Sequence, residues 1–290
     1  MITGTILKGI GGFYYIDTSN GVYECKARGI FRKNKITPVA GDICDIDEIS
    51  DSVGNIIKIH KRKNEFIRPP VANIDNMFIV FAAANPMPVT LLIDKLTILA
   101  EKQGITPIII INKMDLSDSE TEEFIKAYRL AKFEVICVSA KTGEGTERIK
   151  EHLKDKLSVF AGCSGVGKSS ILNVLAPEAD FETGSISQKI KRGKNTTREV
   201  VLFPSYGGYI ADTPGFSFLE ITNIKANELE SYFREFDDYT GGCRFRGCSH
   251  ISEPGCAVKE ALSEGKIGET RYQSYIQLYD KLKDIKDWQV

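Results

Sequence analysis

The sequence predicts a multidomain α/β protein: an N-terminal all-β barrel of the OB type, a central domain with a mostly parallel sheet, and a helical C-terminal domain. Three observations predict this class. Short β-branched pieces separated by glycine, asparagine and proline fill residues 1–68, and continuous apolar runs then alternate with amphipathic stretches over residues 69–220. Residues 221–290 are charged and aromatic and hold a cluster of cysteines. A chain of 290 residues is long enough for two or three such units.

The first 68 residues predict a small barrel, because pieces such as TGTILKGI, GFYYIDT and GNIIKIH recur at the spacing of short strands. Rings in this segment can stack on nucleic-acid bases. For any single ring, a place in the barrel core is the stronger expectation. The proline pair at 69–70 marks the end of the unit. The candidate rings are Phe13, Tyr14, Tyr15, Tyr23 and Phe31.

The central segment predicts a parallel sheet covered by helices on both faces, because its strands are apolar throughout and alternate with amphipathic stretches. Ligands of such sheets bind at the carboxyl ends of the strands. The expected strands are 77–84, 105–111, 133–138 and 157–161. The expected helices are 89–102, 119–131, 145–156 and 168–176, and one more is expected at 269–285 in the last domain.

Charge and composition narrow the class further. The 38 basic and 39 acidic residues nearly balance, but residues 28–35, 61–68 and 189–198 form basic blocks. Such blocks can bind the phosphate backbone of a nucleic acid. The alternative is that they are ordinary solvated surface. No apolar run approaches the roughly 20 residues that cross a bilayer, and no secretion signal is recognisable. We therefore expect a cytoplasmic protein without a membrane anchor. Its seven cysteines are expected to be thiols or metal ligands rather than disulfides.

A phosphate-binding loop is predicted at residues 162–169, which match G-x-x-x-x-G-K-[ST] between an expected strand and an expected helix. Its glycines let consecutive backbone N–H groups surround phosphate oxygens at a helix N-terminus. Lys168 adds charge at the outer phosphates, and the Ser169 hydroxyl is suited to Mg²⁺. The candidate nucleotide ligands are Gly162, Cys163, Ser164, Gly165, Val166, Gly167, Lys168, Ser169 and Ser170.

Two further loops indicate that the base is guanine. Asn112-Lys113-Met114-Asp115 resembles the N-K-x-D motif of GTP-binding proteins, in which Asp115 accepts from the N1–H and the exocyclic amine that adenine lacks. Lys113 packs its stem over the ring. Ser139-Ala140-Lys141 resembles the companion loop whose backbone contacts the guanine oxygen. A four-residue match alone also fits a helix cap, but the pair of loops favours GTP over ATP.

The remaining magnesium and γ-phosphate ligands are expected after the phosphate loop. Asp212-Thr213-Pro214-Gly215 looks like the D-x-x-G motif, with Asp212 at Mg²⁺ and the N–H of Gly215 at the γ-phosphate. Thr197, with Thr196 as the alternative, is expected to place its hydroxyl on Mg²⁺. The predicted Mg²⁺ ligands are therefore Ser169, Thr197 and Asp212.

The order of these motifs predicts a circularly permuted GTPase domain. In the familiar order the phosphate loop comes first, whereas here it follows the two guanine motifs. A binding site needs its loops at one sheet edge, whichever strand comes first, so the site can survive the rearrangement. The permutation leads the D-x-x-G segment directly into the last domain. We therefore expect the nucleotide state to be transmitted to that domain.

Intrinsic hydrolysis is expected to be slow. Phe216 occupies the position where many small GTPases carry a glutamine that orients the attacking water. An apolar ring cannot do this, so a partner or another residue must complete the site.

A metal site is predicted near the C-terminus. Cys243, Cys248, His250 and Cys256 supply three thiolates and an imidazole within fourteen residues, a set suited to tetrahedral zinc. With four protein ligands the site is closed and therefore structural. The alternative is free thiols beside a chance histidine. Arg244 and Arg246, between the ligands, can present charge to RNA.

With a barrel, a permuted GTPase core and a Cys3His cluster in this order, the whole chain resembles the bacterial RsgA family, also called YjeQ or YloQ. The resemblance implies a late-stage assembly factor of the small (30S) ribosomal subunit, whose GTP hydrolysis the subunit stimulates. It implies that the barrel and the zinc domain hold 16S ribosomal RNA while the GTPase core controls release. A monomer is expected, because a symmetric interface and a ribosome-docking surface are hard to combine.

One position departs from the family pattern. Many members have histidine before the two switch threonines, whereas this chain has Asn195, whose amide binds water but is no base near neutral pH. Water is then oriented by Asn195, by backbone groups or by ribosomal RNA. The predicted catalytic residues are Lys168, Asn195, Thr197, Asp212 and Gly215. Two other readings remain open: an RNA-binding module switched by GTP with negligible turnover, and a permuted GTPase acting on another ribosomal particle.

Overall fold

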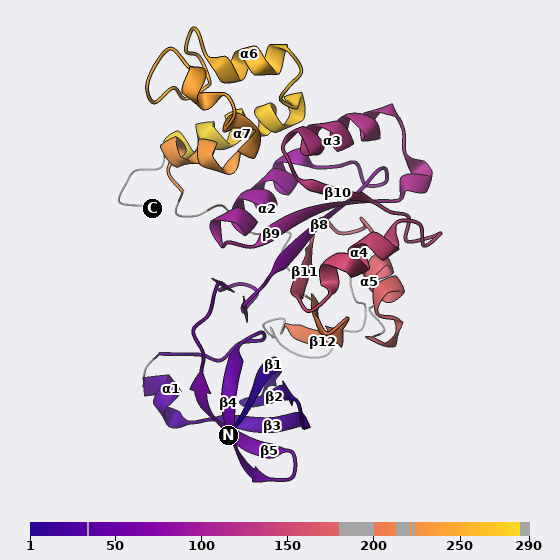
Figure 1. The fold of residues 1–290 in the computed structure, drawn as a ribbon, viewed down its shortest axis with the longest axis vertical. Coiled ribbons are helices and arrows are strands. Elements are labelled where there is room, and N and C mark those ends of the chain that lie inside the picture. The colour runs from indigo at the N-terminus through magenta and orange to yellow at the C-terminus, as the bar shows by residue number, and fades with distance from the viewer. Residues whose placement is uncertain (34, 180–199, 213–220, 222–223, 285–290) are drawn as a thin grey trace.

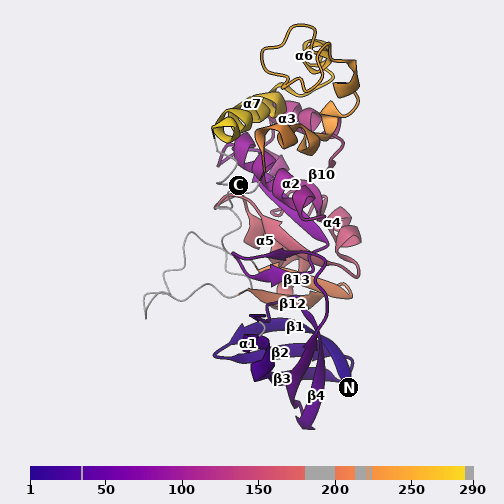
Figure 2. The same ribbon diagram turned by 90° about the vertical axis from the view of Figure 1, so that its left-hand side faces the viewer.

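A computed structural model describes residues 1–33, 35–179, 200–212, 221 and 224–284 (Figure 1). The barrel, the central sheet and the C-terminal helices follow one another along the long axis, and a quarter turn keeps this order (Figure 2). Of the residues singled out in the sequence, Asn195, Thr196, Thr197, Gly215 and Phe216 lie outside the described residues. For Asp212 only the backbone is described.

The N-terminal unit is a closed five-stranded barrel in the order β1-β2-β3-β5-β4, which confirms the predicted class. Inward side chains fill it, among them Ile6, Ile16 and Ile46, which are fully buried. Tyr23 and Phe31 also belong to this core, whereas Phe13 and Tyr15 are half-exposed. The elements are β1 (Ile2–Ile10), β2 (Phe13–Thr18), β3 (Gly21–Ala27), α1 (Gly29–Lys33), β4 (Ile43–Ser50) and β5 (Val53–Ile59).

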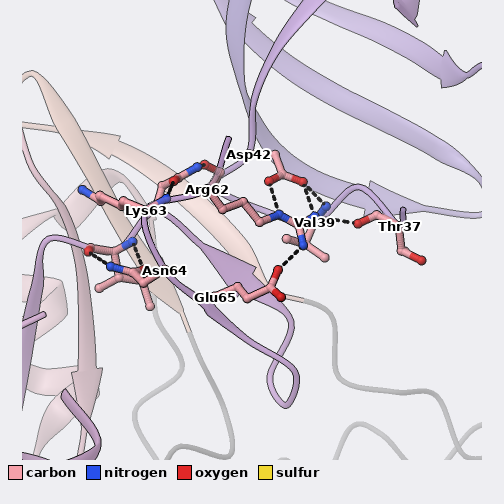
Figure 3. A network of polar contacts seen from close by, with 10 residues as sticks. Thr37, Val39, Asp42, Arg62, Lys63, Asn64 and Glu65 are labelled. Carbon is pink, nitrogen blue, oxygen red and sulfur yellow. Dashed lines mark hydrogen bonds and ion pairs between the residues drawn. The ribbon is translucent and has the colours of Figure 1, made fainter. Parts of the chain in front are cut away.

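A partly buried ion pair fixes the segment that leaves the barrel (Figure 3). Asp42 is fully buried, and its two carboxylate oxygens accept from Arg62 Nε and Nη2 at 2.7 and 2.8 Å. Arg62 also bonds the Thr37 carbonyl and the Glu65 carboxylate. A bidentate guanidinium–carboxylate pair has a fixed geometry, so the barrel loop and the linker are held together. The short hairpin that follows is β6 (Glu65–Phe66) and β7 (Val71–Ala72).

The central domain is a six-stranded sheet in the order β10-β9-β8-β11-β13-β12. All neighbours pair in parallel except β12 and β13, which form an antiparallel hairpin at one edge. The predicted apolar strands are confirmed; β12, in which Leu202 is buried and Pro204 is exposed, was not predicted. The strands are β8 (Asn76–Ala82), β9 (Thr106–Asn112), β10 (Glu134–Cys137), β11 (Leu157–Ala161), β12 (Val201–Ser205) and β13 (Gly208–Asp212).

Helices cover both faces of this sheet, because side chains alternate along each strand. On β8, Ile79 packs into a cluster with Leu96 and Tyr128 from one pair of helices, whereas Phe78 packs with Ile149 and Ile171 from the other pair. The helices begin and end within a few residues of expectation. They are α2 (Thr90–Lys102) and α3 (Ser119–Leu130) on the first face, and α4 (Thr146–Leu153) and α5 (Lys168–Leu175) on the second.

The C-terminal unit packs on α2 and α3 (Figures 1 and 2). Its core contains Phe233, Phe236 and Tyr275, and Ile98 of α2 belongs to the same cluster. No helix within the described ranges has the length and apolar character needed to span a bilayer. The elements are the short 3₁₀ helices η4 (Ala226–Tyr232), η5 (Arg234–Phe236) and η6 (Thr240–Gly242), then α6 (Ala257–Ser263) and α7 (Glu269–Lys283).

Candidate nucleotide-binding site and Cys3His cluster

The phosphate-loop sequence joins β11 to α5, as its pattern requires. Gly162 has φ +139°, and a Cβ there would lie 2.0 Å from the carbonyl oxygen of Val80. Gly167 has φ +93°, and its Cβ would lie 2.2 Å from Nδ2 of Asn112. Only glycine fits at these two positions, because the backbone conformation and the space both exclude a side chain. The loop therefore folds tightly against β8 and β9 before α5 begins at Lys168.

Lys168 stands at the end of the phosphate loop, and its ammonium group folds back onto the start of that loop. Its Nζ donates to the carbonyl oxygens of Gly162 and Cys163 at 2.8 and 2.7 Å. A flexible lysine on a four-carbon stem can exchange these neutral acceptors for phosphate oxygens at small cost. The role of Lys168 at the outer phosphates stays a prediction.

Asn112 joins the three nucleotide loops. It ends β9 and is almost fully buried. Its Nδ2 donates to the carbonyl of Val166 in the phosphate loop at 2.9 Å, and its Oδ1 accepts from the backbone N–H of Ala140 at 3.0 Å. One buried amide thus satisfies groups on both other loops and fixes their spacing.

Asp115 and its neighbours line a pocket of about 390 Å³ between these loops. The Asp115 Oδ1 accepts from the Ser139 hydroxyl at 2.8 Å, and its Oδ2 lies 3.8 Å from Nζ of Lys141. The hydroxyl therefore holds the carboxylate in one orientation. The lining residues are Asn112, Lys113, Asp115, Leu116, Ala140, Lys141, Gly167 and Ser170.

The Lys113 backbone has φ +62°, and its Nζ donates to the carbonyl of Gly165 at 2.9 Å and to the carbonyl of Asn85. Asn85 was not singled out from the sequence, and neither was Leu116, which lines the pocket. The signal for Asn85 was its place in an Asn-Pro pair just after β8, at the same sheet edge as the other loops. The signal for Leu116 was its place directly after Asp115.

The sheet order places these loops at a topological switch point. The chain leaves β8 toward β9 on one side, whereas β11 connects toward the β12–β13 hairpin on the other. Crevices at such points bind ligands. The β13 strand pairs with β11, Val159 opposite Ala211, so Asp212 ends the strand beside the one that leads into the phosphate loop. The predicted roles of the individual site residues stay predictions.

The four predicted metal ligands converge. One ligand atom from each of Cys243, Cys248, His250 and Cys256 lies within 4.8 Å of the others. Nδ1 of His250 is 3.3 Å from Sγ of Cys256 and 3.6 Å from Sγ of Cys243. A tetrahedral zinc ion with ordinary Zn–N and Zn–S lengths requires N···S distances of about 3.5 Å, so the residues fit this ion.

The cluster has supports that sequence reasoning missed. Nε2 of His250 is 2.7 Å from a Glu230 carboxylate oxygen, which fixes the ring so that Nδ1 faces the thiols. On α7, the Tyr272 hydroxyl donates to the His250 carbonyl at 2.6 Å, and the Tyr275 hydroxyl donates to the Ser249 carbonyl at 2.9 Å. No local pattern marks these partners, which lie 20 to 26 residues away in the chain.

Comparison with known proteins agrees with these features. Residues 3–56 match the family model described as RsgA N-terminal domain, and residues 59–222 match the one described as RsgA GTPase. A relative from Ruminiclostridium cellulolyticum is 50% identical, with 99% of this chain and 96% of the relative covered. One from Bacillus subtilis is 44% identical, with 99% of each covered. Both are named Small ribosomal subunit biogenesis GTPase RsgA.

Two solved structures share the whole fold. YjeQ from Thermotoga maritima is 35% identical with a TM-score of 0.81, over 98% of this chain and 99% of that one. YloQ, described as a circularly permuted GTPase, is 38% identical with a TM-score of 0.81, over 99% and 96%. The motif order agrees with the description of YloQ as circularly permuted, and the chain belongs to the RsgA family of circularly permuted, GTP-hydrolysing enzymes.

Proposed function

We propose that this protein hydrolyses GTP as a factor in the maturation of the small ribosomal subunit, the role that its relatives' names describe. The observation that carries the chemistry is the Asn112 amide, which bonds both the phosphate loop and the Ser139-Ala140-Lys141 loop. A guanine-reading carboxylate and a phosphate loop thereby share one pocket. The three units 1–68, 69–220 and 221–290 divide the work into RNA binding, GTP hydrolysis and zinc-supported docking.

The roles of the site residues follow from their chemistry. Asp115 accepts from the guanine edge, Lys113 packs along the ring, and Lys168 neutralises charge on the outer phosphates. Ser169, Thr197 and Asp212 would hold Mg²⁺, which supplies charge stabilisation between the phosphates. The Gly215 N–H and Asn195 act at the γ-phosphate and the attacking water. The remaining nucleotide contacts come from Gly162–Gly167, Ser170 and the 139–141 loop.

The RNA partner is 16S ribosomal RNA, and two features of the barrel support this. Lys8 lies 5.0 Å from the ring centre of Tyr15, and Lys26 lies 4.8 Å from that of Phe13. Half-exposed rings beside ammonium groups suit stacked bases and their phosphates. Tyr23 and Phe31, by contrast, are in the barrel core. The protein acts in the cytoplasm as a monomer.

Phosphate release from GTP tests the proposal. With Mg²⁺ alone we expect slow turnover, because Phe216 cannot orient water, and with purified 30S subunits a rise of at least tenfold. Equal amounts of 50S subunits are the control. Tight GTP binding without stimulation would favour the RNA-binding module with negligible turnover, which Phe216 and Asn195 make the second candidate. Stimulation by 50S instead would assign the enzyme to the other particle.

The Cys3His cluster binds one structural Zn²⁺ in this proposal, and Glu230 positions the histidine ligand. Replacing Glu230 with alanine frees the His250 ring to rotate and to change tautomer, so zinc affinity should fall about 10- to 100-fold. Competition with a chromophoric chelator measures this. Glu228→Ala is the control, because Glu228 lies in the same short helix but bonds the Lys225 N–H. Equal zinc affinity in the Glu230 variant and the wild type would show that the carboxylate has no such role.

A further inference from the structure

The β12–β13 hairpin lies against the barrel. Strand β1 of the barrel contacts β12, and Figures 1 and 2 show the hairpin between the barrel and the rest of the sheet. Leu7 of β1 packs against the core cluster of the central domain that includes Leu202 of β12. The barrel is therefore packed on the strand pair that ends at Asp212, the residue assigned to Mg²⁺.

A hydrogen bond joins this hairpin to the barrel sheet. The Tyr209 hydroxyl, on β13, donates to Oδ2 of Asp17, on β2, at 2.8 Å. Burial of Tyr209 and the Asp17 carboxylate raise the pKa of the phenol to about 12, so the hydroxyl stays protonated and keeps donating near neutral pH. Asp17 stands in mid-sheet, opposite Thr5 of β1 and Val22 of β3. A displacement of Asp17 would therefore also displace the paired residues of β1 and β3.

The rest of the junction is stiff. The partly buried Asp42–Arg62 pair closes the barrel side of the linker (Figure 3), and Asn73 Nδ2 donates to the Gly41 carbonyl at 2.8 Å. A Cβ on Gly41 would lie 2.1 Å from the carbonyl oxygen of Ala72, so the backbone of the barrel loop packs directly on the backbone of β7. Asp75 accepts from the Leu157 N–H at 2.8 Å and ties the linker to β11. Because the linker is held, a displacement of β13 is not absorbed by free rotation of the barrel.

The C-terminal unit is attached elsewhere, on α2 and α3. The chain connection predicts transmission to that unit, whereas the hairpin contacts the barrel through β12 and β1. Tyr209 precedes Asp212 by three residues on one extended strand. A change in the position of Asp212 between nucleotide states therefore moves a strand that is bonded to β2.

We propose that the Tyr209–Asp17 hydrogen bond couples the nucleotide state of the GTPase domain to the RNA-binding face of the barrel. This inference rests on the proposed function for its biological meaning. Coupling between two sites is reciprocal, so RNA bound on the barrel biases the magnesium-binding end of β13 as strongly as nucleotide biases the barrel. The barrel then serves both as a docking module and as one route by which the subunit stimulates hydrolysis.

Hydrogen exchange tests the coupling without ribosomes. In the full-length wild type we expect amides of β2 to exchange at rates that differ by about threefold or more between the GDP state and the state with a non-hydrolysable GTP analogue. Tyr209→Phe removes only the hydroxyl that donates, and Asp17→Ala removes the carboxylate that accepts. Both variants should lose most of this difference while basal turnover stays within about twofold of the wild type.

Tyr206→Phe is the matched control. Its hydroxyl lies in the turn of the same hairpin but donates to the Leu175 carbonyl of the central domain at 3.0 Å, so the nucleotide dependence of β2 should persist. The inference is overturned if wild-type β2 shows no nucleotide dependence, if the dependence survives in Tyr209→Phe, or if Tyr206→Phe abolishes it equally.

A second readout separates this inference from the proposed function. The ratio of 30S affinities with the GTP analogue and with GDP should fall about five- to tenfold in Tyr209→Phe, with the GDP-state affinity unchanged. If wild-type turnover is not stimulated by 30S, the proposed function fails, yet the exchange experiment still decides the coupling. If stimulation occurs and the exchange difference is absent, only the coupling fails.

Discussion

Replacing Asp115 with asparagine should weaken GTP and GDP binding by at least about 100-fold and create affinity for xanthosine nucleotides. In the proposed function the carboxylate accepts two hydrogen bonds from the guanine edge, and bonds to a charged acceptor contribute about 1.5–3 kcal/mol each. Asparagine offers one acceptor, its carbonyl oxygen, and one donor group, its NH2. The NH2 would face the exocyclic amine of guanine, which is also a donor, so no hydrogen bond forms there. Xanthine has a carbonyl in place of that amine and restores the complement.

Calorimetry with GDP and xanthosine diphosphate measures the exchange of specificity. Asp118→Asn is the control, because Asp118 caps α3 by accepting from the Thr121 N–H at 3.0 Å and does not line the guanine pocket. The Ser139 hydroxyl can still donate to the new amide oxygen, so the loop should keep its position. Retention of GDP affinity within threefold in Asp115→Asn, or an equal loss in Asp118→Asn, would contradict the assignment of Asp115 to the base.

The sheet and its covering helices could be predicted because their signal is local. Met77–Ala84 is apolar throughout, and only a strand buried on both faces tolerates this, as Phe78 and Ile79 now show by packing into opposite clusters. Strand β12 carries no such signal. It is short, contains Pro204 and lies at the edge of the sheet, so pairing with β13 rather than local sequence makes it a strand.

The nucleotide loops could be placed for a related reason. Each motif directly follows an apolar strand, and the carboxyl ends of parallel strands share one edge, so the sequence predicts that the loops meet. It could not predict how they are fastened. The Asn112 amide bridges to Val166 and Ala140, and Lys113 reaches Asn85, 28 residues earlier in the chain. Such contacts depend on the assembled sheet.

Polar contacts between the domains left no trace in the sequence. Tyr209 and Asp17 are 192 positions apart, and Arg271 and Asp94 are 177 apart. The basic blocks are recognisable in the sequence because several charges stand together. Arg271, which is fully buried, is a single basic residue in an otherwise ordinary amphipathic helix, α7. A buried charge is recognisable only through its partners.

Arg271→Met should be the most destabilising single replacement at the junction between the C-terminal unit and the central domain. The Arg271 guanidinium is fully buried, donates from Nε and Nη2 to the two Glu235 oxygens at 2.7 and 3.1 Å, and donates from Nη1 to Asp94 at 2.6 Å. Methionine fills part of the space but leaves two buried carboxylates without their cation. Removing one partner of a buried ion pair costs about 3–5 kcal/mol.

Urea unfolding followed by circular dichroism measures this cost. Lys132→Met is the matched control, because the Lys132–Asp238 pair bridges the same two parts of the chain with both side chains about half-exposed. Exposed pairs contribute about 0–1 kcal/mol, so this variant should unfold almost as the wild type does. Arg271→Lys should fall between the two, since an ammonium keeps the charge but cannot bond both Glu235 oxygens and Asp94 in one plane. An Arg271→Met loss no larger than that of the control would contradict the argument.

The ion network of Arg271, Glu235 and Asp94 should also affect how the C-terminal unit and the central domain unfold. Asp94 and Ile98 both lie on α2, so the helix that carries one end of the ion network also contributes a side chain to the C-terminal core. On α7, Arg271 is followed directly by Tyr272, whose hydroxyl donates to the His250 carbonyl in the Cys3His cluster. Loss of the guanidinium should therefore weaken the contacts of α7 with α2 and with the Cys3His cluster. We expect the Arg271→Met transition to split into two steps, the first accompanied by faster zinc release, whereas Lys132→Met should keep a single transition.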